Sequence, residues 1–269
     1  MLGAIIGDIA GSRFEFNNCR RKDFGELLDE KRCYFTDDSI MTLAIARALL
    51  DTYKSRKSAD LDTLKVATID MMKTLGNMYP KGGYGLSFLK WLVSPDSEPY
   101  YSFGNGSAMR VSPVAYVART IKEVKALSEA VTGVTHNHPE GLKGAEATAV
   151  AIFLANSGDY DIPDIKKYIE KHYYKNDFTL DEIRDINKFD ETCQVTVPQA
   201  FQAFYESENF EDSIRNAISI GGDSDTIACI TGSIAEAFYG IPEDLEKKAL
   251  SFLDGILKNI YLEFNKKFM

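Results

Sequence analysis

Two short acidic motifs constrain the fold of this chain more than any other feature of its sequence. The first, at residues 36–39, reads Thr-Asp-Asp-Ser, and the second, at residues 221–226, reads Gly-Gly-Asp-Ser-Asp-Thr. Behind each motif, apolar residues recur at intervals of three and four, which predicts one face of a helix. The fold must therefore accommodate two helix N-termini that are crowded with carboxylates and hydroxyls.

Helix capping is the simplest explanation of either motif alone. Asp, Ser and Thr are preferred N-caps, and a negative charge there suits the helix dipole. A cap needs one side-chain oxygen, however, whereas the two motifs together supply four aspartates and two threonines. Mg²⁺ and Mn²⁺ prefer such oxygen ligands. The pair of motifs therefore favours a shared site for one or two divalent cations.

The charge and the cysteines narrow the class of protein. The chain has 269 residues and a formal net charge of -9, which argues against a nucleic-acid partner because phosphate binding needs a basic surface. Its four cysteines lack the spacing of a metal site or a disulfide framework. The apolar N-terminal run has no basic residues before it and is interrupted by Asp8, so we expect no signal peptide, no membrane span and a cytoplasmic location. We expect a monomer.

The apolar periodicity predicts an all-α protein. Residues 39–54 and 59–79 are strongly periodic, and we expect one further helix over residues 243–265. Strand signals are weak, the best being a short β-branched run at residues 194–197, and no βαβ rhythm appears. The other predicted helices span residues 1–12, 86–93, 112–119, 122–134, 142–156, 197–207, 211–219 and 225–239.

Two further segments carry local signals. Gly3, Gly7 and Gly11 lie on one face of the first helix, and because glycine is a poor helix former they predict close packing of two backbones. Residues 159–192 are charged and rich in tyrosine, with a capping box at residues 179–182. We interpret this stretch as a peripheral helical excursion that could flank the mouth of a site.

In chain order, several segments resemble the ADP-ribosylglycohydrolase family, which includes the dinitrogenase reductase-activating glycohydrolases and the ADP-ribosyl-acceptor hydrolases. The resemblance extends over nearly the whole chain. The matching segments are residues 7–15, 35–39, 83–85, 104–110, 135–136 and 221–226. The resemblance implies a compact orthogonal bundle of α-helices, one domain over residues 1–269, built around two Mg²⁺ or Mn²⁺ ions.

The resemblance also implies a role for particular residues. The implied metal ligands are Thr36, Asp37, Asp38, Asp223, Asp225 and Thr226. The implied catalytic residues are Glu15 and Asp38. The implied substrate-binding residues are Gly83, Tyr84, Gly85, Asn105, Gly106, Ser107, Met109 and His136.

The implied reaction is cleavage of the bond between ADP-ribose and a protein side chain. This cleavage builds oxocarbenium-like charge on the sugar, and bound cations could orient the ribose and activate water. Glu15 is the candidate for acid/base work or for orienting the water; otherwise it is an exposed loop carboxylate. The glycine loops could cradle the diphosphate, although glycine also marks ordinary turns.

Three residues keep two interpretations each. His136 could donate a hydrogen bond to phosphate or ribose, or it could bond nearby backbone. Tyr84 could stack on adenine or pack in the core, and Met109 could contact the ligand or fill the core. No serine or cysteine has an evident base partner, so we expect no covalent catalysis by either.

The expected function is metal-dependent release of ADP-ribose from modified protein side chains, with arginine as the preferred acceptor. Serine-linked substrates and other ADP-ribose derivatives are the nearest alternatives. A different class of protein is a non-catalytic ADP-ribose-binding protein or a crystallin-like structural protein on the same scaffold. Retention of the carboxylates argues against that class, because clustered like charges are costly without cations.

Overall fold

The structure is a computed structural model, and it describes residues 1–53 and 60–269. Within these ranges the chain is helical, and its β-structure is limited to an isolated bridge between Gly104 and Thr192. The all-α prediction is confirmed. The helices are α1 Leu2–Gly11, α2 Asp37–Thr52, α3 Leu61–Met78, α4 Leu86–Val93, α5 Gly106–Met109, α6 Pro113–Val117, α7 Ile121–Thr132, α8 Pro139–Ser157, α9 Ile162–His172, α10 Leu180–Arg184, α11 Cys193–Tyr205, α12 Phe210–Ser219, α13 Ser224–Tyr239, α14 Glu243–Phe252 and α15 Gly255–Phe268.

The predicted single helix over residues 243–265 is wrong, because the chain breaks between α14 and α15. Asp254 lies at this break. Its carboxylate accepts hydrogen bonds from the backbone N–H groups of Ile256 and Leu257 and so forms the N-cap of α15. The Tyr79 hydroxyl also donates to Asp254, at 2.6 Å. A local cap with a tertiary partner thus overrides the helical periodicity.

Other differences concern helix ends and two short segments. The predicted ends at residues 54 and 59 lie outside the described residues. The segment 104–110, which no predicted helix covered, contains the one-turn helix α5. The β-branched run at residues 194–197 belongs to α11, where Val197 is fully buried. Because β-propensity chiefly reports how a side chain packs, burial in a helical layer decides its conformation.

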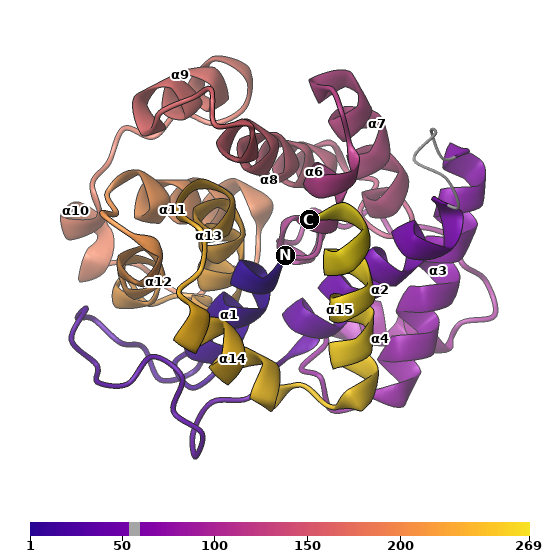
Figure 1. Ribbon diagram of the computed structural model, residues 1–269, viewed down its shortest axis with the longest axis horizontal. Coiled ribbons are helices and arrows are strands. Elements are labelled where there is room, and N and C mark those ends of the chain that lie inside the picture. The colour runs from indigo at the N-terminus through magenta and orange to yellow at the C-terminus, as the bar shows by residue number, and fades with distance from the viewer. Residues whose placement is uncertain (54–59) are drawn as a thin grey trace.

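The first helix lies directly against α13, although more than two hundred residues separate them (Figure 1). A Cβ atom added to Gly7 would lie 2.0 Å from the carbonyl oxygen of Ala228, and one added to Gly3 would lie 2.1 Å from that of Gly232. Only glycine permits this approach. The close backbone packing predicted from the glycine stripe is confirmed.

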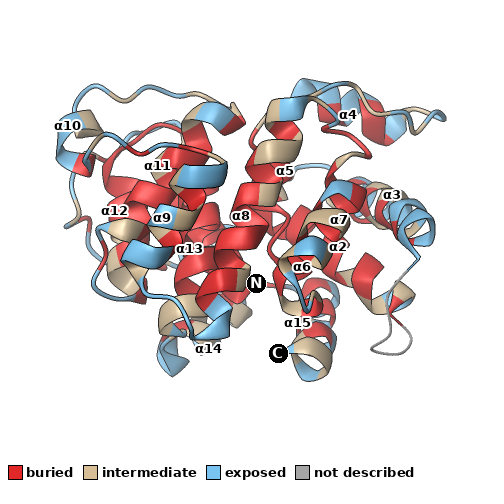
Figure 2. Ribbon diagram, turned by 90° about the horizontal axis from the view of Figure 1, so that it is seen from above, coloured by how far each residue is buried: buried red, intermediate tan, exposed pale blue. Residues whose placement is uncertain are grey.

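Helix α13 is buried except for its last turn, and it packs against α8, which is buried along most of its length (Figure 2). Helix α9 packs on α8 and α11, and α10 packs on α11, so the segment 159–192 is peripheral as expected. The predicted capping box is present: the Thr179 hydroxyl accepts from the Glu182 N–H, and the Glu182 carboxylate accepts from the Thr179 N–H. None of the helices in the described ranges is both long and apolar enough to cross a membrane.

Candidate active site

The first acidic motif is held in place by a buried carboxylate on α1. Asp8 is fully buried and accepts hydrogen bonds from the backbone N–H and hydroxyl of Thr36, at 2.9 and 2.6 Å. It also accepts from the backbone N–H of Ser39 at 3.0 Å and from the Ser39 hydroxyl. Asp8 therefore satisfies donors in the first turn of α2, which has few intrahelical partners for its N–H groups. This leaves the side chains of Asp37 and Asp38 free for another role.

The second motif begins with two glycines in the left-handed region. Gly221 has φ 64° and Gly222 has φ 82°. The N–H of Gly222 donates to the side-chain oxygen of Asn18 at 2.6 Å, and a Cβ on Gly222 would lie 2.7 Å from Nδ2 of Asn187. This turn directs Asp223 and Asp225 toward the N-terminus of α2. The left-handed backbone conformation favours glycine at both positions.

The glycine stripe brings the two motifs together. A Cβ on Gly11 would lie 2.4 Å from Cα of Asp225, so α1 carries Asp8 against the start of α13. Oxygen atoms of Asp8, Asp38 and Asp225 all lie within 4.8 Å of one another, as do oxygen atoms of Glu15, Asp223 and Asp225. Asp225 belongs to both groups. Three of the predicted carboxylates, Asp38, Asp223 and Asp225, thus form one cluster with Asp8 and Glu15, whereas Asp37 lines the same pocket without belonging to either group.

One oxygen in this cluster lacks a partner. Oδ2 of Asp38 accepts from the Thr226 hydroxyl at 3.2 Å, but Oδ1 is buried and has no hydrogen-bond partner among the described residues. A buried oxygen without a partner is costly, and a divalent cation would satisfy it. The donor set consists of oxygens, as Mg²⁺ and Mn²⁺ prefer. The residues present therefore fit a cation site.

The electrostatics of the cluster agree with this fit. Burial, followed by the charge of Asp225, raises the pKa of Asp38 well above its ordinary value. Burial raises the pKa of Asp223 to about 7. Burial and the neighbouring carboxylates of Asp225, Asp8 and Glu191 raise the pKa of Glu15 to about 8. These carboxylates repel one another unless protons or cations compensate them.

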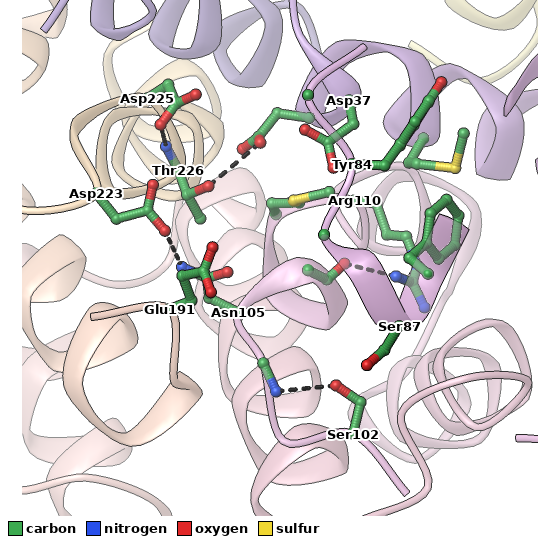
Figure 3. Close-up of a pocket in the computed structure, with 18 of the residues that line it drawn as sticks. Asp37, Tyr84, Ser87, Ser102, Asn105, Arg110, Glu191, Asp223, Asp225 and Thr226 are labelled. Carbon is green, nitrogen blue, oxygen red and sulfur yellow. Dashed lines mark hydrogen bonds between the residues drawn. The ribbon is translucent and has the colours of Figure 1, made fainter. Parts of the chain in front are cut away.

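The cluster opens into a pocket of about 530 Å³ with two chemically different ends (Figure 3). One end holds the carboxylates with Thr226. Across the pocket lie Tyr84, Arg110 and Ser87. The residues from the predicted set that line the pocket are Glu15, Asp37, Asp38, Gly83, Tyr84, Gly85, Asn105, Gly106, Met109, His136, Asp223, Asp225 and Thr226.

Two residues from the predicted set lie behind the pocket wall. The Thr36 hydroxyl donates to Asp8 and accepts from the Asp38 N–H, so it acts as the N-cap of α2. The Ser107 hydroxyl donates to the carbonyl of Gly141 at 2.9 Å and thereby joins α5 to α8. Neither residue is among those that line the pocket.

A hydrogen-bond relay fixes the proton of His136. Arg110 donates to the Thr135 hydroxyl at 2.6 Å, and that hydroxyl lies 2.7 Å from Nδ1 of His136. Arginine only donates, and the same Arg110 nitrogen also lies 3.4 Å from Nδ1, so an unprotonated Nδ1 that accepts from the Thr135 hydroxyl suits both contacts. Burial, followed by the Arg110 charge, lowers the pKa of His136 well below its ordinary value. The network therefore assigns a neutral ring with its proton on Nε2, the nitrogen beside Gly106.

The glycine loops are tied to the acidic end. Nδ2 of Asn105 donates to Oδ2 of Asp223 at 2.6 Å, and the N–H of Asp37 donates to the carbonyl of Gly82 at 2.6 Å. Gly83 has φ 95°, which only glycine adopts easily. Tyr84 is buried with its ring 5.4 Å from that of Phe88. Loops and carboxylates consequently form one continuous wall.

Comparison with known proteins agrees with this architecture. A sequence model of the ADP-ribosylglycohydrolase family matches residues 1–266. The chain belongs to this family. It is 23% identical to the ADP-ribosylhydrolase ARH3 of Homo sapiens, over 99% of this chain and 93% of that protein. It is 27% identical to the ADP-ribosylarginine hydrolase Tri1 of Pseudomonas putida, over 93% of this chain and 73% of that protein.

A solved structure shares the fold. It is described as an ADP-ribosylglycohydrolase-related protein complex, and it matches with a TM-score of 0.68 at 20% identity, covering 100% of this chain and 97% of that chain. The family membership and the shared fold confirm the resemblance drawn from the ordered motifs.

The pocket residues that sequence reasoning missed include Phe16, Arg110 and Glu191, and the supporting residue Asp8 was missed as well. Asp8 could have been found from the sequence, because an aspartate inside an apolar helix is rarely buried unless it has hydrogen-bond or charge partners. Arg110 stood in a recognised motif but was not singled out, and it is only 1% exposed. Phe16 and Glu191 also line the pocket, and no pattern in the sequence distinguished them from ordinary loop residues.

Proposed function

We propose that this family member hydrolyses the glycosidic bond between ADP-ribose and a protein side chain, with arginine as the acceptor and two divalent cations as cofactors. The observation that carries the proposal is the two-ended pocket: a carboxylate cluster with a partnerless buried oxygen on Asp38 faces donors suited to a diphosphate. Family membership supports the reaction class, and the name of the relative Tri1 supports the arginine linkage.

The acidic end would hold the cations and the reacting ribose. Asp37, Asp38, Asp223 and Asp225 would supply the ligands, with Asp225 shared between the two groups of carboxylates. When bound, the cations would hold ribose hydroxyls and lower the pKa of water. The Thr226 hydroxyl, which donates to Asp38, would keep that carboxylate oriented.

Glu15 would carry the proton transfer. Its carboxylate lies with those of Asp223 and Asp225 at the pocket wall and is half-buried, so it is accessible to water and to the acceptor side chain. Water adds its oxygen to the anomeric carbon, the bond to the acceptor nitrogen breaks, and the acceptor leaves with a proton. Glu15 would take the proton from the attacking water at its carboxylate oxygen and pass it to the departing acceptor nitrogen.

The opposite end would bind the diphosphate through neutral donors backed by a buried cation. Nε2–H of His136 and the backbone N–H groups of the glycine loops can donate to phosphate oxygens. Arg110 forms no ion pair with any described residue, and burial lowers its pKa to about 10, so it is still charged at neutral pH. Its charge would favour an anionic ligand above it.

The test measures free ADP-ribose released from an arginine-ADP-ribosylated protein and, separately, from a serine-ADP-ribosylated peptide. Each substrate is incubated with Mg²⁺, with Mn²⁺ and after chelation. We expect cation-dependent release from the arginine substrate, and we expect the Glu15→Gln and Asp223→Asn variants to lose it. The exposed Glu208 lies outside the pocket, and Glu208→Gln provides a control with the same change of charge.

Each alternative gives a distinct result. Release from the serine substrate alone would contradict the arginine assignment but would still support a hydrolase. Binding of ADP-ribose without release from either substrate would favour a non-catalytic member of the family.

A further inference from the structure

The pocket mouth carries an exposed aromatic pair. Phe16 lines the pocket and is 81% exposed, which is unusual for a phenylalanine. Its ring centroid lies 5.8 Å from that of Phe189, which is 41% exposed. Phe16 follows Glu15 in the chain, so the pair stands immediately beside the residue assigned to proton transfer. Exposed rings that adjoin a pocket point to contact with a ligand.

An unpaired carboxylate stands next to this pair. Glu191 is exposed, lines the pocket, and forms no side-chain hydrogen bond or ion pair with any described residue. Figure 3 shows it beside Asn105, on the same side of the pocket as Asp223. It follows Phe189 by two residues and is one of the carboxylates that face Glu15. Glu191 therefore belongs to the reacting end of the pocket.

The backbone holds Glu191 in a fixed position. Its carbonyl accepts from the Asn105 N–H at 2.7 Å, and the next residue but one, Cys193, donates its N–H to the Phe103 carbonyl at 3.0 Å. On the other side, the Asp190 carboxylate accepts from the Thr192 N–H at 2.8 Å. The segment is thus joined to the glycine loop of the pocket, and Glu191 projects from an anchored strand-like bridge.

We propose that Phe16, Phe189 and Glu191 form an acceptor platform that recognises the guanidinium group of the modified arginine. This inference rests on the proposed hydrolase function and extends it to a specificity site. A guanidinium stacks on aromatic faces and pairs with carboxylates through a planar fork of donors. A serine acceptor offers neither charge nor a planar group, so the platform discriminates against it.

The acceptor platform is distinct from the groups that would hold ADP-ribose. The reacting ribose is assigned to the carboxylate cluster and the diphosphate to the donors around His136, whereas the acceptor must leave beside Glu15. The mouth next to Glu15 is where Phe16 and Glu191 lie. Removing the platform should consequently weaken binding of the acceptor side chain and leave binding of the ADP-ribose moiety unchanged.

The experiment compares binding of two peptides of equal sequence, ADP-ribosylated through arginine or through serine, by calorimetry with Mg²⁺ present. The Glu15→Gln background keeps both substrates intact. Adding Glu191→Gln should weaken binding of the arginine-linked peptide about tenfold, whereas the serine-linked peptide and free ADP-ribose should bind unchanged. Phe189→Leu keeps apolar area but removes the ring, and it should act in the same direction.

Two control variants separate specific effects from general ones. Glu208→Gln removes one exposed charge away from the pocket, and Ile186→Ala truncates an exposed apolar side chain on the same segment as Phe189. Neither should alter binding of any ligand. In the otherwise unmodified protein, Glu191→Gln should raise KM for the arginine substrate.

Equal weakening for arginine-linked and serine-linked peptides, or no change for either, would overturn the acceptor platform. Because these binding measurements need no turnover, they are independent of the release assay. Failure of release from every substrate would contradict the proposed function, whereas linkage discrimination that is unchanged in the Glu191→Gln variant would contradict only this inference.

Discussion

The carboxylate of Asp8 accepts both the backbone N–H and the hydroxyl of Thr36, at 2.9 and 2.6 Å. A residue of the first helix thus caps the second helix from outside, through a contact between segments 28 residues apart. The same carboxylate accepts two hydrogen bonds from Ser39. Because Asp8 satisfies these donors, the two aspartates between Thr36 and Ser39 can face the pocket.

Replacing Asp8 by alanine should destabilise the protein by about 3 kcal/mol or more, because buried donors of Thr36 and Ser39 lose their acceptor. Asp8→Asn should cost much less. Its amide oxygen can accept from the backbone N–H groups, and its amide N–H can donate to the Thr36 hydroxyl. Urea unfolding with a chelator present measures both. Equal losses for the two variants would contradict the capping role.

Unlike the Asp8 variants, Asp38→Asn should not lower the stability of the cation-free protein. Asp38 has a buried oxygen without a partner among the described residues, and its pKa is raised by burial and by Asp225. Without cations, the neutral amide relieves repulsion, so the free energy of unfolding at pH 8 should equal or exceed that of the original protein. The gain in melting temperature on adding Mg²⁺ should disappear, together with turnover. Retention of that gain would argue against Asp38 as a ligand.

Gly7→Ala should destabilise the protein by about 3 kcal/mol or more, because the new Cβ would lie 2.0 Å from the Ala228 carbonyl oxygen. Gly255→Ala is the matched control, since a Cβ there meets nothing within 4 Å at the start of α15. It should be neutral or stabilising by up to about 1 kcal/mol. Thermal and urea unfolding compare the two. A mild effect at Gly7 would mean that α1 and α13 can separate cheaply.

Stability without cations should fall as the pH rises. The pKa of Asp223 rises from its ordinary value of 3.8 to about 7, and that of Glu15 rises from 4.5 to about 8. Between these values the folded protein binds more protons than the unfolded chain, so its free energy of unfolding decreases with pH through this window. The slope for the buried Asp223 approaches about 1.4 kcal/mol per pH unit.

Mg²⁺ should reverse this trend, because cation ligands must be deprotonated. The difference in melting temperature between protein with Mg²⁺ and protein with chelator should be larger at pH 8 than at pH 6. Scanning fluorimetry at both values tests this expectation. A difference that does not change with pH would mean that cations bind away from the carboxylate cluster.

The sequence was informative where the chemistry is local. Apolar periodicity predicted helices such as α2 and α13, because a helix must bury one face whatever it packs against. Gly3, Gly7 and Gly11 predicted a close backbone approach, because their missing side chains have no other common use on a helix face. The break at Asp254 escaped prediction, since part of its stabilisation comes from Tyr79, far away in the chain.

For the site, the sequence by itself determined which oxygen-bearing residues stand at two helix N-termini, and their order placed the chain in its family. Only the tertiary structure decided which of these oxygens are already engaged. The Thr36 hydroxyl already donates a hydrogen bond to Asp8, whereas Asp38 has a buried oxygen without a partner among the described residues. It also placed Glu191 and Phe16 at the mouth. Spacing along the chain fixes the face of a helix, but pairing between distant segments depends on how their surfaces pack.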